Sequence, residues 1–550
     1  MLLCSFRNFV LTGTAIASMG LISTASAADL ARAAAPAAPM GVAWQGIYVG
    51  GHLGTSWGQS DWRNPTGFFA VPPSDIPAKG ATDGLLGGLQ VGYNHQIGAW
   101  VMGVGADVSL TAFDGHANTG GLPGFGGSGS FSHTRTNTLA SLTGRIGYAQ
   151  GRTLYYVKGG LGYAHDKYDN SSFFFPQIGS ASANRWGWTF GIGAEYAIGA
   201  GWSAFGEYNV YDFGRKTSAF SGAGLLPAPS TYNIGRTQQV VKFGVNYRWG
   251  WDNTNLSAPV VTSDVKGEFG TRLGLSTGKF RKDLFAPANA NQLNSRLTYP
   301  DLTAASLEGF VRLDHTSGVF AKANIGGANV YGGKLFDEDF PPAIAPYSDT
   351  VSQQKNGRQT YGTLDLGYTF LRGQGWNVGA FVGYHFYNQR LNARGCDQIA
   401  GNPFVCSPGQ VPAGQLTISE REEWKALRLG LSGETYLTNR IKLSGDVAYT
   451  PYVDFKSTDS HWLRPNINAL RESATGHAGF MAEAILSYDV TRDLSVGLGA
   501  RYAYLKADKG STSFPFTPPS PMKFETSRYG AFLQAAYKFG APAEAVVAKY

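Results

Sequence analysis

Residues 240–249 read Val-Val-Lys-Phe-Gly-Val-Asn-Tyr-Arg-Trp, which is the pattern of a β-strand that ends in an aromatic residue. Every second residue from Val241 to Trp249 is apolar, and the residues between, from Lys242 to Arg248, are polar or Gly. Side chains of a strand point alternately to two faces, so the pattern predicts one apolar and one polar face. A membrane barrel turns its apolar face to lipid and its polar face to the lumen. A soluble β-sandwich shows the same alternation, so other features must decide between them.

The composition favours the membrane barrel. The chain has 74 Gly among 550 residues, 13% aromatic residues and only 15% charged residues, whereas soluble domains carry about 25% charged residues. No apolar run after residue 27 is long enough for a spanning helix, so any membrane span must be a closed barrel. The net charge of +7 comes without a block of basic residues, so nucleic acid is not expected as a partner.

The first residues predict export. Arg7 supplies a positive start, an apolar stretch runs from Phe9 to Leu21, and Ala25-Ser26-Ala27 is a cleavage pattern for small residues. We therefore expect a signal peptide over residues 1–27. An Ala/Pro-rich lead follows over residues 28–43.

The cysteines agree with an oxidising compartment. Cys4 lies in the expected signal peptide, and Cys396 and Cys406 lie close together in a Gly/Pro-rich segment. We predict a loop disulfide between Cys396 and Cys406. The sequence has no CxxC and no metal-type Cys/His spacing, so neither a metal nor a cofactor is expected.

Alternating segments divide the chain into two all-β domains. Eight strands are predicted between residues 44 and 250, at 44–58, 84–97, 99–110, 136–149, 153–164, 186–197, 202–212 and 238–249. A polar linker is expected over residues 251–264. Ten more strands are predicted between residues 265 and 540, at 265–281, 295–315, 318–334, 357–372, 375–393, 420–437, 440–456, 474–490, 492–507 and 524–539.

Short turns alternate with long loops in both domains, as in outer-membrane barrels with periplasmic turns and extracellular loops. The fold predicted is therefore a tandem of transmembrane antiparallel β-barrels, about eight strands and then about ten. A tail over residues 541–550 ends the chain. A single pore of about eighteen strands is the competing architecture, and the linker and the complete eight-strand pattern argue against it.

The first half resembles the small eight-stranded outer-membrane surface antigens, often called porin-family proteins. The likeness covers about residues 28–250. It rests on the terminal strand and on three motifs: Trp44-x-Gly46-x-Tyr48-x-Gly50-Gly51, Gly144-Arg145-x-Gly147-Tyr148 and Lys158-Gly159-Gly160-x-Gly162-Tyr163. It implies a fold and a bacterial outer-membrane location but no reaction. Side chains largely fill an eight-stranded lumen, so a wide pore is not expected.

The second half resembles the omptin family of outer-membrane endopeptidases, which are ten-stranded barrels. The likeness covers about residues 265–540. The structural motifs are Gly274-Leu275-Ser276-Thr277-Gly278-Lys279, Gly383-Tyr384, Ala393-Arg394-Gly395 and Leu429-Gly430-Leu431-Ser432-Gly433. Two further segments, 332–340 and 457–462, match the Asp-x-Asp and Asp-x-His motifs of the family. The resemblance implies a catalytic role for Asp337, Asp339, Asp459 and His461.

The chemistry of these four residues can also be argued from the pattern alone. Residues i and i+2 of an extended chain share a face, so Asp337 projects with Asp339, and Asp459 with His461. We expect both pairs just beyond strand ends, in extracellular loops that face each other across the barrel mouth. Asp459 would orient His461, which would act as general base on a water. Asp337 and Asp339 would hold that water from the opposite wall.

The specificity positions depart from the family. Omptins that prefer basic residues use two acidic groups to receive the Lys or Arg before the cleaved bond. The matching positions here are Lys282, or Asp283 if the register slips by one, and Ser457. A basic substrate side chain would then lack part of its counter-charge.

The lipid-A phosphate motif of the family is also incomplete. Tyr384 matches it, but Phe386 and Asn388 stand where an acid and a base are expected. The expected partners are outer-membrane lipid, including lipopolysaccharide, and a peptide or protein substrate.

Two functions follow as hypotheses. The first is an outer-membrane endopeptidase of the aspartic type that hydrolyses peptide bonds with an activated water. The alternative is a non-enzymatic surface protein, such as an adhesin, antigen or porin-like protein, on a degenerate protease barrel. Cleavage of unfolded peptides separates the two.

Overall fold

The computed structural model describes most of the chain from residue 42 to residue 540. The described ranges are 42–64, 74–121, 129–172, 179–199, 201–221, 230–249, 265–340, 346–402, 404–407, 410–464, 470–514 and 518–540. The predicted signal peptide, most of the predicted lead, the linker and the tail lie outside these ranges. Within them no helix is long and apolar enough to cross a membrane.

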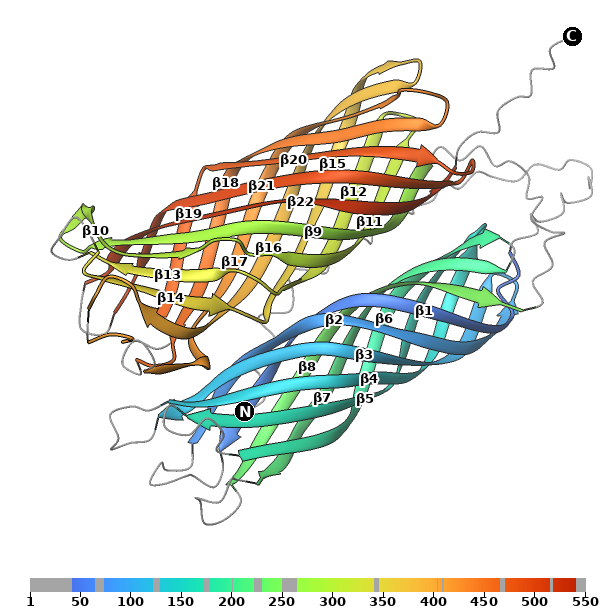
Figure 1. The fold of residues 1–550 in the computed structure, drawn as a ribbon. Coiled ribbons are helices and arrows are strands. Elements are labelled where there is room, and N and C mark those ends of the chain that lie inside the picture. Colours follow the sequence, from blue (N-terminus) through green and yellow to red (C-terminus); the bar gives the residue numbers. More distant parts are fainter. Residues whose placement is uncertain are drawn as a thin grey trace, which may run out of the picture. The chain divides into compact units, whose positions relative to one another are not determined.

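The first half forms a closed antiparallel barrel of eight strands in sequence order (Figure 1). Its strands are β1 (Gly46–Asn64), β2 (Ser74–Ile97), β3 (Trp100–Gly121), β4 (Gly129–Gln150), β5 (Thr153–Ser172), β6 (Gly179–Gly199), β7 (Trp202–Phe220) and β8 (Ser230–Arg248). Pairing of β8 with β1 closes the ring. All eight predicted strands are present, and most extend further at one end than the alternation indicated. The tight turns use Gly98, Gly151 and Gly201 at positive φ, which Gly adopts without strain.

Ion pairs fill the lumen of this first barrel. Lys158 Nζ lies 2.6 Å from a carboxylate oxygen of Glu207, and Lys242 Nζ lies 2.6 Å from Asp107. All four side chains are almost fully buried. Buried charges need such partners, because an isolated charge in a dry lumen is very costly. The packed lumen agrees with the prediction that the first barrel has no wide pore.

The second half forms a ring of ten long strands, as predicted (Figure 1). They are β9 (Val265–Ala286), β11 (Ala304–His315), β12 (Val319–Val330), β15 (Gly357–Gly373), β16 (Trp376–Gln398), β17 (Val411–Tyr436), β18 (Ile441–His461), β20 (Ala478–Asp489), β21 (Leu494–Thr512) and β22 (Ser520–Phe539). Pairing of β22 with β9 closes the ring. Two rings, each closed on itself, contradict the single eighteen-stranded pore.

Four short strands build an upper tier on this ring. They are β10 (Asn289–Tyr299), β13 (Lys334–Asp339), β14 (Ser348–Gln354) and β19 (Leu470–Gly476). Each of them continues one of the long strands β11, β12, β15 and β20 after a few residues that are not in strand conformation. Asp301, Gly333 and Asn356 lie in three of these connections, with φ of 54°, 122° and 56°. Because β9, β16, β17, β18, β21 and β22 run through both levels, the upper tier is also a closed ring.

The prediction of a long loop after the third strand of this barrel was wrong. Residues 334–339 and 348–354 form the paired strands β13 and β14 instead. The buried face of β14 consists of Ser348, Thr350, Ser352 and Gln354. A polar inner face gives no apolar alternation, so the sequence pattern resembled that of a loop.

The lower ring carries the lipid-facing belt. Leu273, Leu364, Leu429, Leu498 and Leu533 point outward with 46–64% of their surface exposed. Among the described residues of β10, β13, β14 and β19, no large apolar side chain is exposed in this way. The upper tier therefore stands outside the lipid.

An aromatic plug closes the lumen of the second barrel between the two levels. It consists of buried rings on β9, β10, β17, β18 and β22, namely Phe280, Tyr299, Trp424, Phe455 and Phe524. The ring centroid of Phe455 lies 4.3 Å from that of Trp424 and 4.1 Å from that of Phe524.

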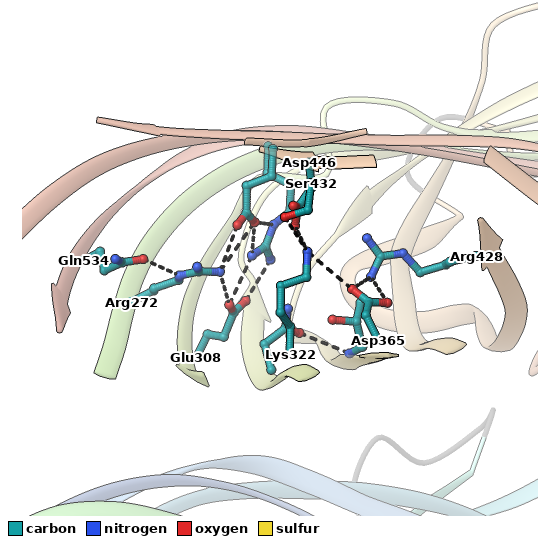
Figure 2. A network of polar contacts seen from close by, with 12 residues as sticks. Arg272, Glu308, Lys322, Asp365, Arg428, Ser432, Asp446 and Gln534 are labelled. Atoms are coloured by element: carbon teal, nitrogen blue, oxygen red, sulfur yellow. Dashed lines mark hydrogen bonds and ion pairs between the residues drawn. The ribbon is translucent and has the colours of Figure 1, made fainter. Parts of the chain in front are cut away.

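A charged network lies in the lumen of the second barrel (Figure 2). Arg428 lies 2.8 Å from Asp365, and Lys322 lies 2.6 Å from Asp446. Six of its charged residues come from six different strands, namely Arg272, Glu308, Lys322, Asp365, Arg428 and Asp446. Glu483 of β20 and Arg501 of β21 extend the network. A cavity of about 200 Å³ lies among these side chains. The buried rings of the plug lie between this cavity and the upper tier.

Removal of a plug ring should destabilise the second barrel. We expect Phe455→Ala to lower the free energy of unfolding by about 3–5 kcal/mol, because Phe455 is fully buried among aromatic rings. The matched control is Phe404→Ala, since Phe404 is 90% exposed, and it should change little. Denaturant unfolding in detergent micelles measures both. Equal effects of the two substitutions would contradict the plug.

Candidate active site

Asp459 and His461 lie at the upper end of β18, with their side chains on the inner face. The inner face of this strand alternates through Val453, Phe455 and Ser457, which are buried. His461 Nε2 lies 2.9 Å from Asp459 Oδ2. The predicted i, i+2 pair therefore forms a hydrogen-bonded dyad in the upper tier.

Asp337 and Asp339 lie on β13, on the same face as Leu335, which packs in the lumen. In the upper ring β14, β16 and β17 separate β13 from β18 on one side, and five strands separate them on the other. The two pairs thus occupy nearly opposite walls, as the sequence predicted.

The placement of the four residues in loops was wrong. β13 is paired with β10 and β14, and the end of β18 is paired with β17 and β19. The reason is that the barrel continues above the lipid, where its strands no longer need an apolar outer face. Side chains on paired strands are held more rigidly than on loops.

The dyad is electrostatically coupled. Burial alone would raise the pKa of Asp459, but His461 and Lys282 beside it lower that pKa overall. Burial would lower the pKa of His461, but the Asp459 carboxylate raises it above its ordinary value. The carboxylate of Asp337 on the other wall adds to this rise in the pKa of His461.

Asp337 has its own perturbed pKa. Burial and the neighbouring carboxylate of Asp339 raise it to about 6, and His461 opposes the rise. One wall therefore carries a carboxyl group that holds a proton more tightly than usual. The other wall carries a histidine that does the same.

Lys282 is not an open pocket residue. Its ammonium lies 2.6 Å from Asp459, 2.7 Å from Glu420 and 3.1 Å from Glu472, and its side chain is 3% exposed. The residue beside it, Asp283, pairs with Arg281 and Arg296 instead. The residue of the two that contacts Glu420, Asp459 and Glu472 is therefore Lys282, and its match to the specificity position of the family stays a prediction.

Ser457, the second predicted pocket residue, is buried and donates a hydrogen bond to Glu472. It contacts the same cluster of charges but contributes no charge. The cluster has four members on β9, β17, β18 and β19, and we call it the lysine cluster: Lys282, Glu420, Asp459 and Glu472.

Glu420 and Glu472 were missed by the sequence reasoning. Glu420 alternates with Glu422, Trp424 and Ala426 on the buried face of β17, so the period-two pattern did contain a signal. Acidic residues near a barrel mouth are ordinarily solvated, so alternation alone does not mark them as site residues. Burial raises the pKa of both Glu420 and Glu472.

The predicted disulfide is present. Cys396, at the end of β16, is bonded to Cys406 across a Cα–Cα distance of 5.4 Å. Among the residues that the structure describes, no group of three or more His, Cys, Asp or Glu side chains is arranged to hold a metal ion.

Comparison with known proteins gives a class for each half. Residues 16–249 match the model of the outer membrane protein beta-barrel domain, and residues 268–517 match that of the Omptin family. The 31 kDa outer-membrane immunogenic proteins of Brucella melitensis and Brucella suis are each 30% identical over 242 residues, which is 41% of this chain and 94% of theirs.

Solved structures resemble the chain at low identity. The outer membrane protease OmpT from Escherichia coli is 15% identical with a TM-score of 0.42, and the alignment covers 50% of this chain and 97% of that one. The attachment invasion locus protein Ail of Yersinia pestis is 14% identical with a TM-score of 0.16, over 36% of this chain and 99% of that one.

The fold and the comparisons together define an outer-membrane β-barrel protein of bacteria, with two barrels in one chain. It belongs to the outer membrane protein beta-barrel family through its first domain, and its second domain is an Omptin family domain.

Because the pKa of Asp337 is raised, we predict that Asp337→Asn increases the free energy of unfolding by an amount that depends on pH. Below about pH 4 the carboxyl is protonated in both the folded and the unfolded state, so it has no effect on stability. Between about pH 4 and pH 6 the unfolded state loses the proton first, so stability falls as pH rises. We expect Asp337→Asn to relieve this penalty, with a gain on the order of 2 kcal/mol at pH 8 and almost none at pH 4.

Denaturant unfolding at the two pH values measures this difference. Asp397→Asn, which alters an exposed carboxylate of β16, is the matched control. If Asp337→Asn increased the free energy of unfolding by the same amount at both pH values, the raised pKa of Asp337 would be contradicted.

Proposed function

We propose that the second barrel is an endopeptidase at the bacterial surface. A water held between the Asp459–His461 dyad and the Asp337–Asp339 pair attacks the carbonyl carbon of a peptide bond. The observation that carries this proposal is the position of the hydrogen-bonded dyad and the Asp pair on nearly opposite walls of one closed ring. The match to the Omptin family model supports it.

Each residue has a role that its contacts support. His461 Nε2 is held by Asp459, so the other ring nitrogen, Nδ1, takes the proton of the attacking water. Asp459 stabilises the imidazolium that forms. That proton then passes to the leaving amine, and no covalent intermediate forms on the chain.

Asp337 and Asp339 position the water on the opposite wall. With a pKa of about 6, Asp337 exchanges a proton near neutral pH, so it holds the water by donating or by accepting a hydrogen bond. The plug beneath keeps lumen water away from the site. The substrate is a peptide or protein that enters from outside, because the upper tier stands above the lipid-facing belt. Binding of lipopolysaccharide stays a prediction.

Peptide cleavage tests the proposal. The refolded protein in lipid is incubated with a broad library of unfolded peptides, beside Asp459→Asn and His461→Ala. We expect wild-type cleavage and a fall in rate of at least about 10²-fold in both variants, because general-base catalysis contributes that much. His315→Ala is the control and should keep the wild-type rate, because His315 is exposed at the end of β11, far from β18 in the sheet. Absence of cleavage, or equal rates in all variants, would support the non-enzymatic alternative.

A second role concerns the first barrel. Its 30% identity to outer-membrane immunogenic proteins favours a surface-exposed, antigen-like domain without chemistry. We expect an epitope inserted between β3 and β4 to be labelled by antibody on intact cells. An epitope inserted at Gly151, in the tight turn between β4 and β5, should be labelled only after permeabilisation. The reverse labelling pattern would contradict an extracellular position of the connection between β3 and β4.

A further inference from the structure

A lysine with almost no exposed surface lies directly beneath the proposed dyad. Lysine is rarely buried unless it is paired, because its ammonium loses its hydration. Lys282 recovers this loss through three carboxylates at 2.6–3.1 Å. Its position is therefore determined by the acidic residues around it.

These acidic residues come from adjacent strands on one wall. Glu420 of β17 is the cross-strand neighbour of Asp459, and Glu472 of β19 is the neighbour of Ser457. Lys282 is on β9, only one strand away from β13 and its Asp337. Its side chain thus crosses the lumen from the wall of the Asp pair to the wall of the dyad.

The ammonium shares an atom with the proposed catalytic machinery. Asp459 Oδ2 lies 2.6 Å from Lys282 Nζ and 2.9 Å from His461 Nε2. The other oxygen of Asp459 and one oxygen of Glu420 are buried without a partner among the described residues. The cluster therefore presents acceptor atoms for a cation immediately below the site of bond cleavage, and Lys282 supplies that cation from within the chain.

We propose that Lys282 determines specificity as a resident cation, in the place that a basic substrate side chain would otherwise take. This rests on the proposed peptidase function. The wild-type protein should then prefer peptides with an uncharged side chain at the cleaved bond. A basic side chain meets the ammonium of Lys282, and an acidic one meets the surrounding carboxylates.

Removal of the ammonium should reverse this preference. Lys282→Ala leaves room and three carboxylates for a cation from outside, whereas Lys282→Met fills the room without charge. For matched peptides that differ only in Arg or Leu before the cleaved bond, we expect the Arg-to-Leu ratio of kcat/KM to rise by about tenfold or more in Lys282→Ala. It should stay close to the wild-type ratio in Lys282→Met.

A binding measurement that needs no activity accompanies the kinetics. Ethylammonium chloride should raise the Tm of Lys282→Ala above its value in sodium chloride of equal strength. It should leave the Tm of the wild type and of Lys282→Met unchanged. If ethylammonium stabilises Lys282→Ala while no variant cleaves any peptide, the cation-binding position of Lys282 is supported and the peptidase proposal is refuted. If Lys282→Ala folds only with ethylammonium present, the resident cation is also supported.

The opposite results overturn the proposal. A folded Lys282→Ala that keeps the wild-type Arg-to-Leu ratio and gains no stability from ethylammonium shows that Lys282 has only a structural role. If Lys282→Ala folds under neither condition, Lys282→Ser decides, because its small hydroxyl can donate a hydrogen bond to a carboxylate and still leaves room for a cation from outside. A wild-type ratio in Lys282→Ser refutes the resident cation, and a raised ratio supports it.

Discussion

One carboxylate oxygen connects the two halves of the site in the second barrel. Asp459 Oδ2 accepts a hydrogen bond from His461 and binds the ammonium of Lys282. The first contact raises the pKa of His461, and the second helps to keep Asp459 ionised in a buried position. Glu420 and Glu472 bind the same ammonium, and together the three carboxylates compensate Lys282 for its lost hydration.

The membrane imposes a second constraint that explains where this chemistry is possible. Within the lipid-facing belt, the strands must present apolar residues outward and satisfy every charge inward. The network of Arg272, Glu308 and their neighbours satisfies that rule (Figure 2). Above the belt the outer face is free to be polar. The upper tier uses this freedom to bring β13 and β18 to opposite walls, with the aromatic plug as a floor.

The sequence predicted most of the barrel and only part of the site. Alternation predicted all eighteen long strands. The resemblance to the omptin family singled out the four site residues, and the i, i+2 spacing predicted that the members of each pair share a face. Alternation failed at β14, whose inner face is polar, and it placed the four site residues in loops rather than strands. Both failures come from the upper tier, where lipid no longer selects an apolar face.

The lysine cluster was beyond sequence reasoning for a different reason. Lys282, Glu420 and Glu472 are far apart in the chain, and only closure of the upper ring brings them together. Lys282 stands where the omptin family has an acidic residue, so the sequence indicated that a basic substrate side chain would lose part of its counter-charge. The structure reveals three carboxylates around that lysine, so the position carries a cation of its own.

The titration of His461 is the most direct test that one oxygen serves both partners. Histidine-labelled protein contains 9 imidazoles, and the signal that disappears in His461→Ala identifies the one in the dyad by NMR. Loss of the carboxylate in Asp459→Asn should lower the pKa of His461, and loss of the ammonium in Lys282→Met should raise it. A His461 pKa that is the same in the wild type and both variants would contradict the shared carboxylate.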